Sequence, residues 1–257
     1  MSLSSNSLIH ITNSIEKLKS IITEGFRIKY CQEDILFRDA SSIGIYVPMV
    51  SFCDIPLSEI KRHISLYGLG VDEKGKETNV AYGIGLKKSW AEKKGLNPVL
   101  YVDKQSSLGV NFSGACNRLL QNKKIKELSE EELGINDIFR YMKNYEADLI
   151  RSNQEQLYNY RFSDEREWRY VPSIGQADFI HPSTLINSLG MKDEMNKKIE
   201  HLRLGFDIID IKYLILSNDN EIHDFSKWLG EFFIGRDEDI LKLQSRIITV
   251  DQILNDF

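Results

Sequence analysis

Cysteine and proline are scarce in this sequence, with three cysteines and five prolines among 257 residues. Cys31, Cys53 and Cys116 are widely spaced, with no CxxC pair and no neighbouring pair of histidines. This pattern indicates neither a disulfide framework nor a zinc site. No apolar run approaches the length of a membrane span, and the first residues lack the basic and apolar regions of a signal peptide. We therefore expect a cytoplasmic protein with no metal and no membrane anchor.

Positive charge is also in short supply. The net charge is −5 and the sequence pI is about 5.6, which argues against a broad electrostatic grip on nucleic acid or on anionic lipid. Lys123, Lys124 and Lys126 form the densest basic run, and the solvated face of a helix explains it. A nucleic-acid partner stays possible only if folding assembles a basic track. The glycine fingerprints of dinucleotide and phosphate loops are missing as well.

What is present is a series of short strands and amphipathic helices. We expect strands at 8–11, 47–52, 81–86, 98–102, 211–216 and 246–250, and helices at 15–24, 57–64, 87–94, 191–202 and 223–233. Thr12 or Asn13 is expected to cap the first helix and Gly25 to end it. Residues 27–46 and 173–190 show no clear period and are expected to be loops. Glycines at alternate positions of the strand at 81–86 indicate close approach of a ligand or another backbone.

The segment at about 113–155 differs in character. It is rich in lysine, glutamate, leucine and asparagine with helical spacing, so we expect two or three helices inserted between strands. No repeat or linker interrupts the rest. The prediction is one α+β domain over residues 1–257 with a helical insertion at about 113–155.

The stretch from Ser163 to Pro172 carries the strongest candidate chemistry. As a strand it would place Glu165, Glu167 and Arg169 on one face, because strand side chains alternate between faces. Two adjacent carboxylates aimed at one space indicate acid–base or electrostatic catalysis. The structural alternative is that these carboxylates pair with Arg161, Arg166 or Arg169 across the sheet, since alternating charges are common on strands.

Several runs resemble the AbiGi family of abortive phage-resistance proteins. They are His10-Ile-Thr, Gly25-Phe26, Pro48 to Leu57, Tyr82 to Leu86, Asn97 to Tyr101 and Glu167-Trp-Arg169. The resemblance covers most of the chain outside the helical insertion. It implies the antitoxin half of a two-protein system, with a toxin encoded by a neighbouring gene as the partner.

The order of elements also resembles, more remotely, the DarT-like ADP-ribosyltransferases, which modify nucleic acid using NAD. This resemblance implies an ADP-ribosyltransferase-like split mixed β-sheet or sandwich with flanking helices. His10 and Thr12 would then hold NAD and Phe52 would lie near the nicotinamide, with Tyr82 among the cofactor-binding residues. Glu167 would be the catalytic carboxylate, and Arg38 matches a functional arginine by position only. The chain departs from the pattern at Asp54, where the relatives carry an arginine.

The implied chemistry suits these residue types. Breaking the nicotinamide–ribose bond develops positive charge on the ribose, which a carboxylate such as Glu167 would stabilise. Glu165 could position the acceptor, and an arginine would pair with the pyrophosphate.

Two classes of function follow. One is an NAD-dependent ADP-ribosyltransferase or NAD-consuming enzyme of anti-phage defence. The other is an inactive antitoxin or binding module on the same scaffold, which neutralises a partner toxin. An acid–base hydrolase is a weaker third. The sequence leaves the acceptor, the partner's identity and the oligomeric state open.

Overall fold

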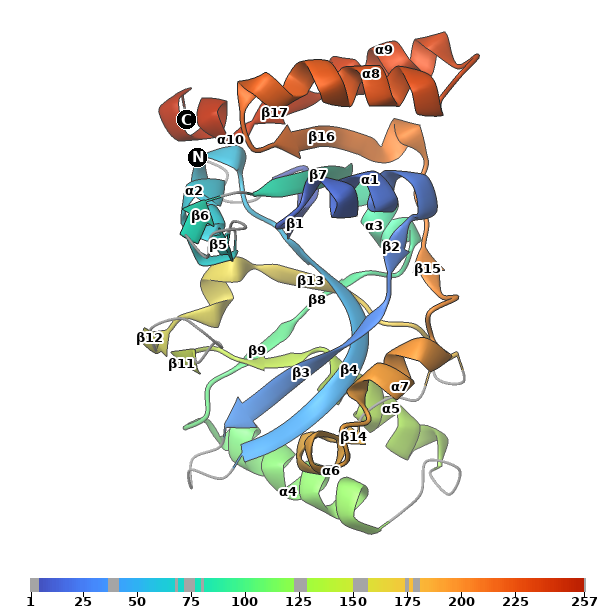
Figure 1. Ribbon diagram of the computed structural model, residues 1–257. Helices are drawn as coiled ribbons and strands as arrows, with labels where there is room; N and C mark the ends of the chain where they lie inside the picture. Colours follow the sequence, from blue (N-terminus) through green and yellow to red (C-terminus); the bar gives the residue numbers. More distant parts are fainter. Residues whose placement is uncertain are drawn as a thin grey trace. The chain divides into compact units, whose positions relative to one another are not determined.

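The computed structural model describes residues 5–36, 42–67, 69–71, 77–79, 81–122, 129–149, 157–173, 176–177 and 181–256. The chain forms two compact units. The first comprises residues 1–27, 51–95 and 203–257, and the second comprises residues 28–50 and 96–202. Strand β4 (Ser42–Cys53) contributes to both. The fold is α+β with mixed strand pairing (Figure 1). The split architecture of an ADP-ribosyltransferase stays a prediction.

The first unit is built on a sheet of strand order β17-β16-β7-β1-β4. β7 lies antiparallel between β1 and β16, while β16 and β17 run parallel. Its strands are β1 (Ser7–Thr12), β2 (Phe26–Arg27), β5 (Leu69–Val71), β6 (Glu77–Asn79), β7 (Tyr82–Lys87), β15 (Arg203–Leu204), β16 (Ile211–Leu216) and β17 (Ile247–Thr249). Its helices are α1 (Ile15–Glu24), α2 (Leu57–Tyr67), α3 (Lys88–Lys93), α8 (Ile222–Phe232), α9 (Asp237–Gln244) and α10 (Val250–Asp256). Helices α8 and α9 lie beside β16 and β17 (Figure 1).

Local sequence explains the first strand–helix unit, with one correction. The expected caps Thr12 and Asn13 are wrong, because the hydroxyl of Ser14 accepts the hydrogen bond from the Lys17 amide at 3.2 Å. Gly25, with φ +82°, ends α1 as expected. The core beneath contains Ile9, Ile55, Ile60, Ile64, Ala81, Ile215, Val250 and Ile253. Apolar side chains from β1, α2, β16 and α10 thus close around one centre.

The second unit combines short strands with four helices among its described residues. Its strands are β3 (Lys29–Leu36), β8 (Asn97–Pro98), β9 (Leu100–Val102), β10 (Met142–Asn144), β11 (Ala147–Leu149), β12 (Leu157–Tyr160), β13 (Glu167–Tyr170) and β14 (His181–Pro182). Its helices are α4 (Ser107–Asn122), α5 (Glu130–Arg140), α6 (Ser183–Leu189) and α7 (Lys192–Lys198). β3 and β14 pair antiparallel with β4, β13 pairs antiparallel with β8, and β10 pairs parallel with β9.

The expected loop at 27–46 is wrong over its described part. β3 pairs with β4 along its whole length, from Lys29 opposite Met49 to Leu36 opposite Ser42. The strand pattern was hidden because the inward face of β3 carries Glu33 between Cys31 and Ile35. Cys31 and Ile35 pack into an apolar cluster. A charged residue at a core position breaks the alternation that marks a strand.

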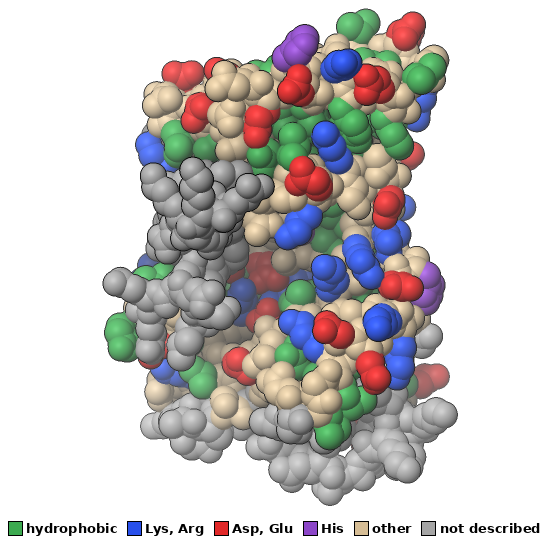
Figure 2. Space-filling view, in the orientation of Figure 1, with side chains coloured by type: hydrophobic (Ala, Val, Ile, Leu, Met, Phe, Trp, Pro, Cys, Tyr) green, Lys and Arg blue, Asp and Glu red, His purple; other side chains and the backbone are tan. Residues whose placement is uncertain are grey.

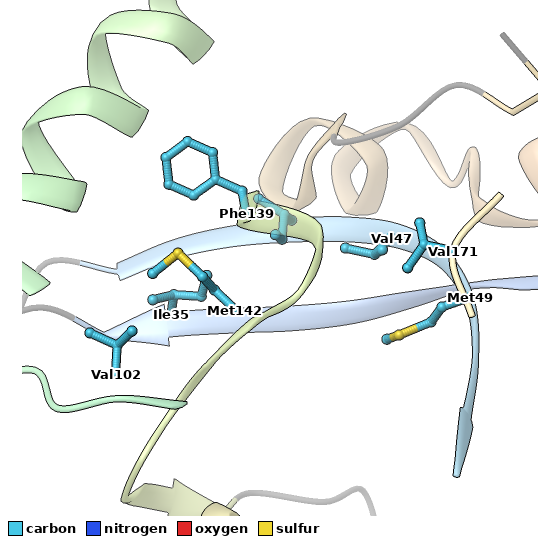
Figure 3. Close-up of a cluster of buried hydrophobic side chains, with 8 residues drawn as sticks. Ile35, Val47, Met49, Val102, Phe139, Met142 and Val171 are labelled. Carbon is cyan, nitrogen blue, oxygen red and sulfur yellow. The ribbon is translucent and has the colours of Figure 1, made fainter. Parts of the chain in front are cut away.

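That cluster forms the core of the second unit (Figure 3). It contains Ile35, Ile45, Val47, Met49, Val102, Phe139, Met142 and Val171. Phe139 reaches it from the end of α5, over the paired strands β3 and β4 (Figure 3). Burial of these side chains holds the strands on which the charged site is built.

The helical insertion expected at about 113–155 stays a prediction. Helices α4 and α5 overlap the segment, and Met142–Asn144 and Ala147–Leu149 within it are strands. The loop expected at 173–190 is wrong for Ser183–Leu189, which is helix α6. The single domain over residues 1–257 stays a prediction, since compact units do not say whether each folds alone.

A glycine on β7 yields the first prediction. A Cβ on Gly85 would lie 2.8 Å from Cδ2 and 3.2 Å from Cβ of Tyr213 on the neighbouring strand. We expect Gly85→Ala to lower the free energy of unfolding by about 1–3 kcal/mol, because the Tyr213 ring must move out of a packed position. Urea denaturation checks this.

Gly230→Ala is the matched control. Gly230 lies in α8 of the same unit, and a Cβ there meets no described atom within 4 Å. Alanine should stabilise the helix by about 0.5–1 kcal/mol. Equal effects of the two substitutions would contradict the packing argument.

Candidate functional site

The candidate site of the second unit is centred on two side chains of β13. Glu167 and Arg169 are two residues apart, so they point to the same face of the strand. Both are buried, at 5% and 0% exposure. This shared face confirms part of the sequence prediction. We call Glu33, Lys143, Glu165, Glu167 and Arg169 the buried charge cluster.

Every guanidinium nitrogen of Arg169 donates a hydrogen bond. Its Nε donates to Glu167 Oε1 at 2.6 Å and its Nη2 donates to Glu167 Oε2 at 3.2 Å. Nη2 also lies 2.9 Å from Glu33 Oε1 on β3. Nη1 donates to the carbonyl oxygen of Arg140 at 3.1 Å. A bidentate pair of this kind fixes orientation as well as charge.

Lys143 on β10 joins the two glutamates. Its Nζ lies 2.9 Å from Glu165 Oε2 and 2.9 Å from Glu167 Oε2. The prediction that Glu165 and Glu167 share a strand is wrong, because Glu165 ends a 3₁₀ turn, η2 (Phe162–Glu165). Arg166 follows in the left-handed region with φ +45°. That turn, rather than strand alternation, brings the Glu165 carboxylate to the ammonium group.

The ionisation of Glu167 reflects this pairing. Burial raises its pKa, but Arg169 and Lys143 outweigh burial and lower the pKa to about 2. Burial acts against the charged form of Lys143 too, and Glu167, Glu33 and Glu165 together raise its pKa well above the ordinary value. Both groups are therefore charged at neutral pH.

Glu33 behaves in the opposite way. Burial raises its pKa, and the pairing with Arg169 and Lys143 does not overcome that effect. The cluster holds three carboxyl groups against two cations, so one negative charge is in excess. Burial therefore favours the protonated form of Glu33, and its protonation would balance the cluster at two charges of each sign.

Two tyrosines complete the surroundings of the cluster. The Tyr101 hydroxyl accepts a hydrogen bond from the Glu167 amide at 2.8 Å, and the Tyr160 hydroxyl donates to Glu165 Oε1 at 3.2 Å. Burial raises the pKa of Tyr101 above its usual range. Each carboxylate of β13 and η2 is thus held from more than one side.

The first unit carries the residues predicted to hold NAD. His10 on β1 donates from Nδ1 to the Ser51 carbonyl oxygen at 2.8 Å. Its ring centroid lies 5.2 Å from that of Phe26 and 5.6 Å from that of Phe52. Burial lowers the pKa of His10, so the ring is neutral at pH 7. His10 is half-buried, and this geometry is that of a histidine held by the fold itself through a hydrogen bond and ring contacts.

Phe52 and Tyr82 are buried. Phe52 is 1% exposed and packs edge-on against Phe26 and Trp90. Tyr82 is 6% exposed, and its hydroxyl donates to Glu221 Oε1 at 2.6 Å. Thr12 lies opposite Tyr82 in the β1–β7 pair. The structure thus brings His10 to Phe52 and Thr12 to Tyr82, within one unit.

The remaining predicted relationships stay predictions. Arg38 lies outside the described residues. The shared cleft would join His10 of the first unit to Glu167 of the second, and the NAD-binding roles depend on it. Asp54, at which the chain departs from the DarT-like pattern, has its Oδ2 2.5 Å from Lys88 Nζ.

The described residues bear on metal and membrane as well. They contain no group of three or more His, Cys, Asp or Glu side chains placed to hold a metal ion. None of the described helices has both the length and the apolar character of a membrane span.

Sequence reasoning missed Lys143 and Glu33, the two partners that decide the electrostatics. Lys143 lay in a segment expected to be helical, and Glu33 in one expected to be a loop. The alternation of buried and half-buried residues over Met142–Asn144 is the signal for β10, but three residues are too few to establish a period.

Comparison with known proteins gives two findings. Residues 24–217 match the family model described as "Putative abortive phage resistance protein AbiGi, antitoxin". The chain is 26% identical over 231 residues to the "Abortive phage resistance protein AbiGi" of Lactococcus lactis subsp. cremoris, covering 82% of this chain and 89% of that protein. No solved structure matches.

The buried pair yields a stability prediction. We expect Arg169→Met to lower the free energy of unfolding by about 3–5 kcal/mol, because it leaves Glu167 and Glu33 buried without the guanidinium. Arg161→Met is the control in the same unit, since Arg161 is half exposed and its Nε lies 3.9 Å from Glu146. That variant should lose less than about 1 kcal/mol. Chemical denaturation measures both, and similar losses would contradict the role given to the cluster.

A pH prediction follows from the lowered pKa of Glu167. Its folded pKa of about 2 lies below the ordinary 4.5, so its stabilisation is complete above about pH 4.5 and is lost as the pH falls toward 2. We expect the stability difference between wild type and Glu167→Gln to shrink over that range. Glu33 shifts in the opposite sense but is present in both proteins. A difference that does not change with pH would contradict this prediction.

Proposed function

Because the chain belongs to the AbiGi family of abortive phage resistance proteins, we propose that it is an antitoxin that binds and neutralises a partner toxin. The partner would be the protein product of a neighbouring gene. Neutralisation in this proposal is by protein contact, without a chemical step.

One observation carries the choice of binding over catalysis. Both carboxylate oxygens of Glu167, the leading catalytic candidate, are held by cations: Oε1 by Arg169 and Oε2 by Arg169 and Lys143. A carboxylate that stabilises a developing ribose cation must present an oxygen to the sugar. Here the negative charge that Glu167 would offer to a substrate is already neutralised by Arg169 and Lys143.

The surroundings of Glu167 point the same way. Glu167 is 5% exposed, and its backbone is bonded on both sides, with the amide donating to Tyr101 and the carbonyl accepting from the Val99 amide at 2.9 Å. Freeing the side chain for a substrate would leave Arg169 buried without its bidentate partner. The cost of that step is several kcal/mol, so the cluster suits a rigid scaffold better than a reaction centre.

The positions of the candidate NAD-binding residues Phe52 and His10 do not favour ADP-ribosyl transfer. The candidate nicotinamide contact Phe52 is enclosed by aromatic rings, and His10 is bonded to a backbone carbonyl. An antitoxin does not need these residues to contact NAD. It needs a stable fold and an exposed surface that complements its partner.

Co-expression tests the proposal. We expect the wild-type chain to restore growth to cells that express the toxin of the neighbouring gene. We also expect it to form a complex of fixed stoichiometry with that toxin. Size-exclusion chromatography with light scattering measures the complex. Glu167→Gln, which keeps the shape of the side chain, should neutralise as well as wild type wherever its melting temperature shows that it is folded.

The enzymatic alternative predicts different outcomes. An enzyme would consume NAD, and NAD would raise the melting temperature of the wild-type chain. Loss of neutralisation by folded Glu167→Gln, together with NAD turnover by wild type, would sink the antitoxin proposal. Growth that is not restored by wild type would sink it as well.

A further inference from the structure

Helix α8 has a second apolar row beside the one that it buries. Phe225 and Leu229 are fully buried, and Phe233 at its end is 8% exposed. Trp228 and Phe232, one position away on the helix, stack on each other with centroids 5.7 Å apart and planes at 18°. Phe232 is 49% exposed and Ile234 in the following turn is 82% exposed. We call Trp228, Phe232 and Ile234 the apolar ridge.

Much of the apolar surface of the ridge is not packed into the core of the first unit. Single exposed apolar residues are ordinary on protein surfaces, whereas a contiguous row often marks an interaction site. Lys19 of α1 lies with its Nζ 5.2 Å from the Trp228 ring centroid, which covers one side of the row. Phe232 and Ile234 stay accessible at the α8–α9 turn.

An acidic helix start follows the ridge in the sequence. Helix α9 begins with Asp237, Glu238 and Asp239 directly after the turn. Three cations of α8, the turn and α9 lie close to acidic side chains: Arg236 Nη2 is 2.9 Å from Asp239, Lys242 Nζ is 3.8 Å from Glu238, and Lys227 Nζ is 3.9 Å from Glu231. In the view of Figure 2, hydrophobic, acidic and basic side chains intermingle over the region of α8 and α9.

The charge is concentrated in this part of the chain. Residues 219–257 contain nine acidic and four basic side chains, a net charge of −5 that equals the net charge of the whole chain. The first 218 residues are therefore neutral overall. This segment also lies beyond residues 24–217, which the family model matches, so the surface is not a feature that the family description supplies.

Helix stability explains only part of this pattern. Acidic residues in a first turn stabilise a helix through its dipole, and α5 carries the same three-residue acidic start in Glu130, Glu131 and Glu132. The dipole accounts for Asp237 and Glu238. It does not account for a large apolar residue that is 82% exposed between the two helices.

We propose that the apolar ridge and its acidic rim are the surface on which a basic protein docks, with an apolar side chain of that protein packed against Phe232 and Ile234. Within the antitoxin function proposed above, on which this assignment rests, the basic protein is the toxin. A second copy of this chain is disfavoured as the occupant, because two faces of the same negative charge would repel each other.

The test uses the purified full chain and the purified toxin of the neighbouring gene, with affinity measured by calorimetry. Ile234→Ser removes the anchor, and we expect it to weaken binding about tenfold. Asp237→Asn with Glu238→Gln removes rim charge and should slow association and reduce its dependence on salt.

Matched controls come from the second unit. Tyr158→Ser removes an apolar side chain that is 71% exposed, and Glu130→Gln with Glu131→Gln removes two charges from the first turn of α5. Both controls should bind as wild type does. Melting temperatures within a few degrees of wild type exclude misfolding as the cause of any loss.

A second probe separates this inference from the proposed function. A synthetic amphipathic helix of leucine and lysine should bind wild type about tenfold more tightly than Ile234→Ser, and its leucine–glutamate counterpart should bind neither. If wild type fails to bind the toxin, the proposed antitoxin function is contradicted. The affinities of wild type and Ile234→Ser for the lysine peptide then test the docking surface by themselves.

Three outcomes would overturn the docking surface. They are equal affinity of wild type and Ile234→Ser for the toxin, equal affinity of the two for the lysine peptide when the toxin does not bind, and a dimer of wild type that Ile234→Ser dissolves. The last would assign the ridge to a second copy of this chain.

Discussion

A buried arginine with a buried glutamate on the same strand is the constraint around which the second unit is arranged. Arg169 is fully buried, and a buried guanidinium is tolerated only when its donors are satisfied and its charge is met. Glu167 meets the charge, Glu33 adds a second carboxylate, and the Arg140 carbonyl takes a further donor. Residues from β3, β10 and β13 must therefore stay in register. A slip of one residue on β13 would turn both charges to the opposite face.

That constraint decides how the chemistry of the cluster is used. Two carboxylates and a lysine in one place are the materials of an acid–base site, and the same groups make a neutralised scaffold when each is paired within the protein. The distances favour the second use, since Lys143 lies 2.9 Å from both glutamates and Arg169 lies 2.6 Å from one. Under the antitoxin function proposed above, recognition of the partner then depends on what the scaffold presents at its surface.

Sequence reasoning succeeded where an element carries a plain apolar pattern. β1 and β16 were predicted from short apolar runs, and α1 and α8 from apolar residues at helical spacing, with Gly25 marking the end of α1. It failed at β3, where Glu33 occupies a core position, and at β10, which has three residues. Because these two strands were missed, Glu33 and Lys143 were not recognised as members of the charge cluster. From sequence the two glutamates could be paired only with the arginines of their own segment, because a pairing between distant segments leaves no local pattern.

The two kinds of charge in this chain differ in what they can do at a distance. Charges of the buried cluster meet their counter-charges within about 3 Å, so their fields cancel close to the source and contribute to stability and register. The surplus charge of residues 219–257 has no equal opposite charge in its own segment. Its field extends about a Debye length, roughly 8–10 Å, into solution and acts on whatever approaches. In the docking proposed above, the paired charges of the buried cluster hold the fold and the net negative charge of residues 219–257 acts on the partner. Fold and recognition can then change independently, since a substitution on the acidic rim leaves the core register intact.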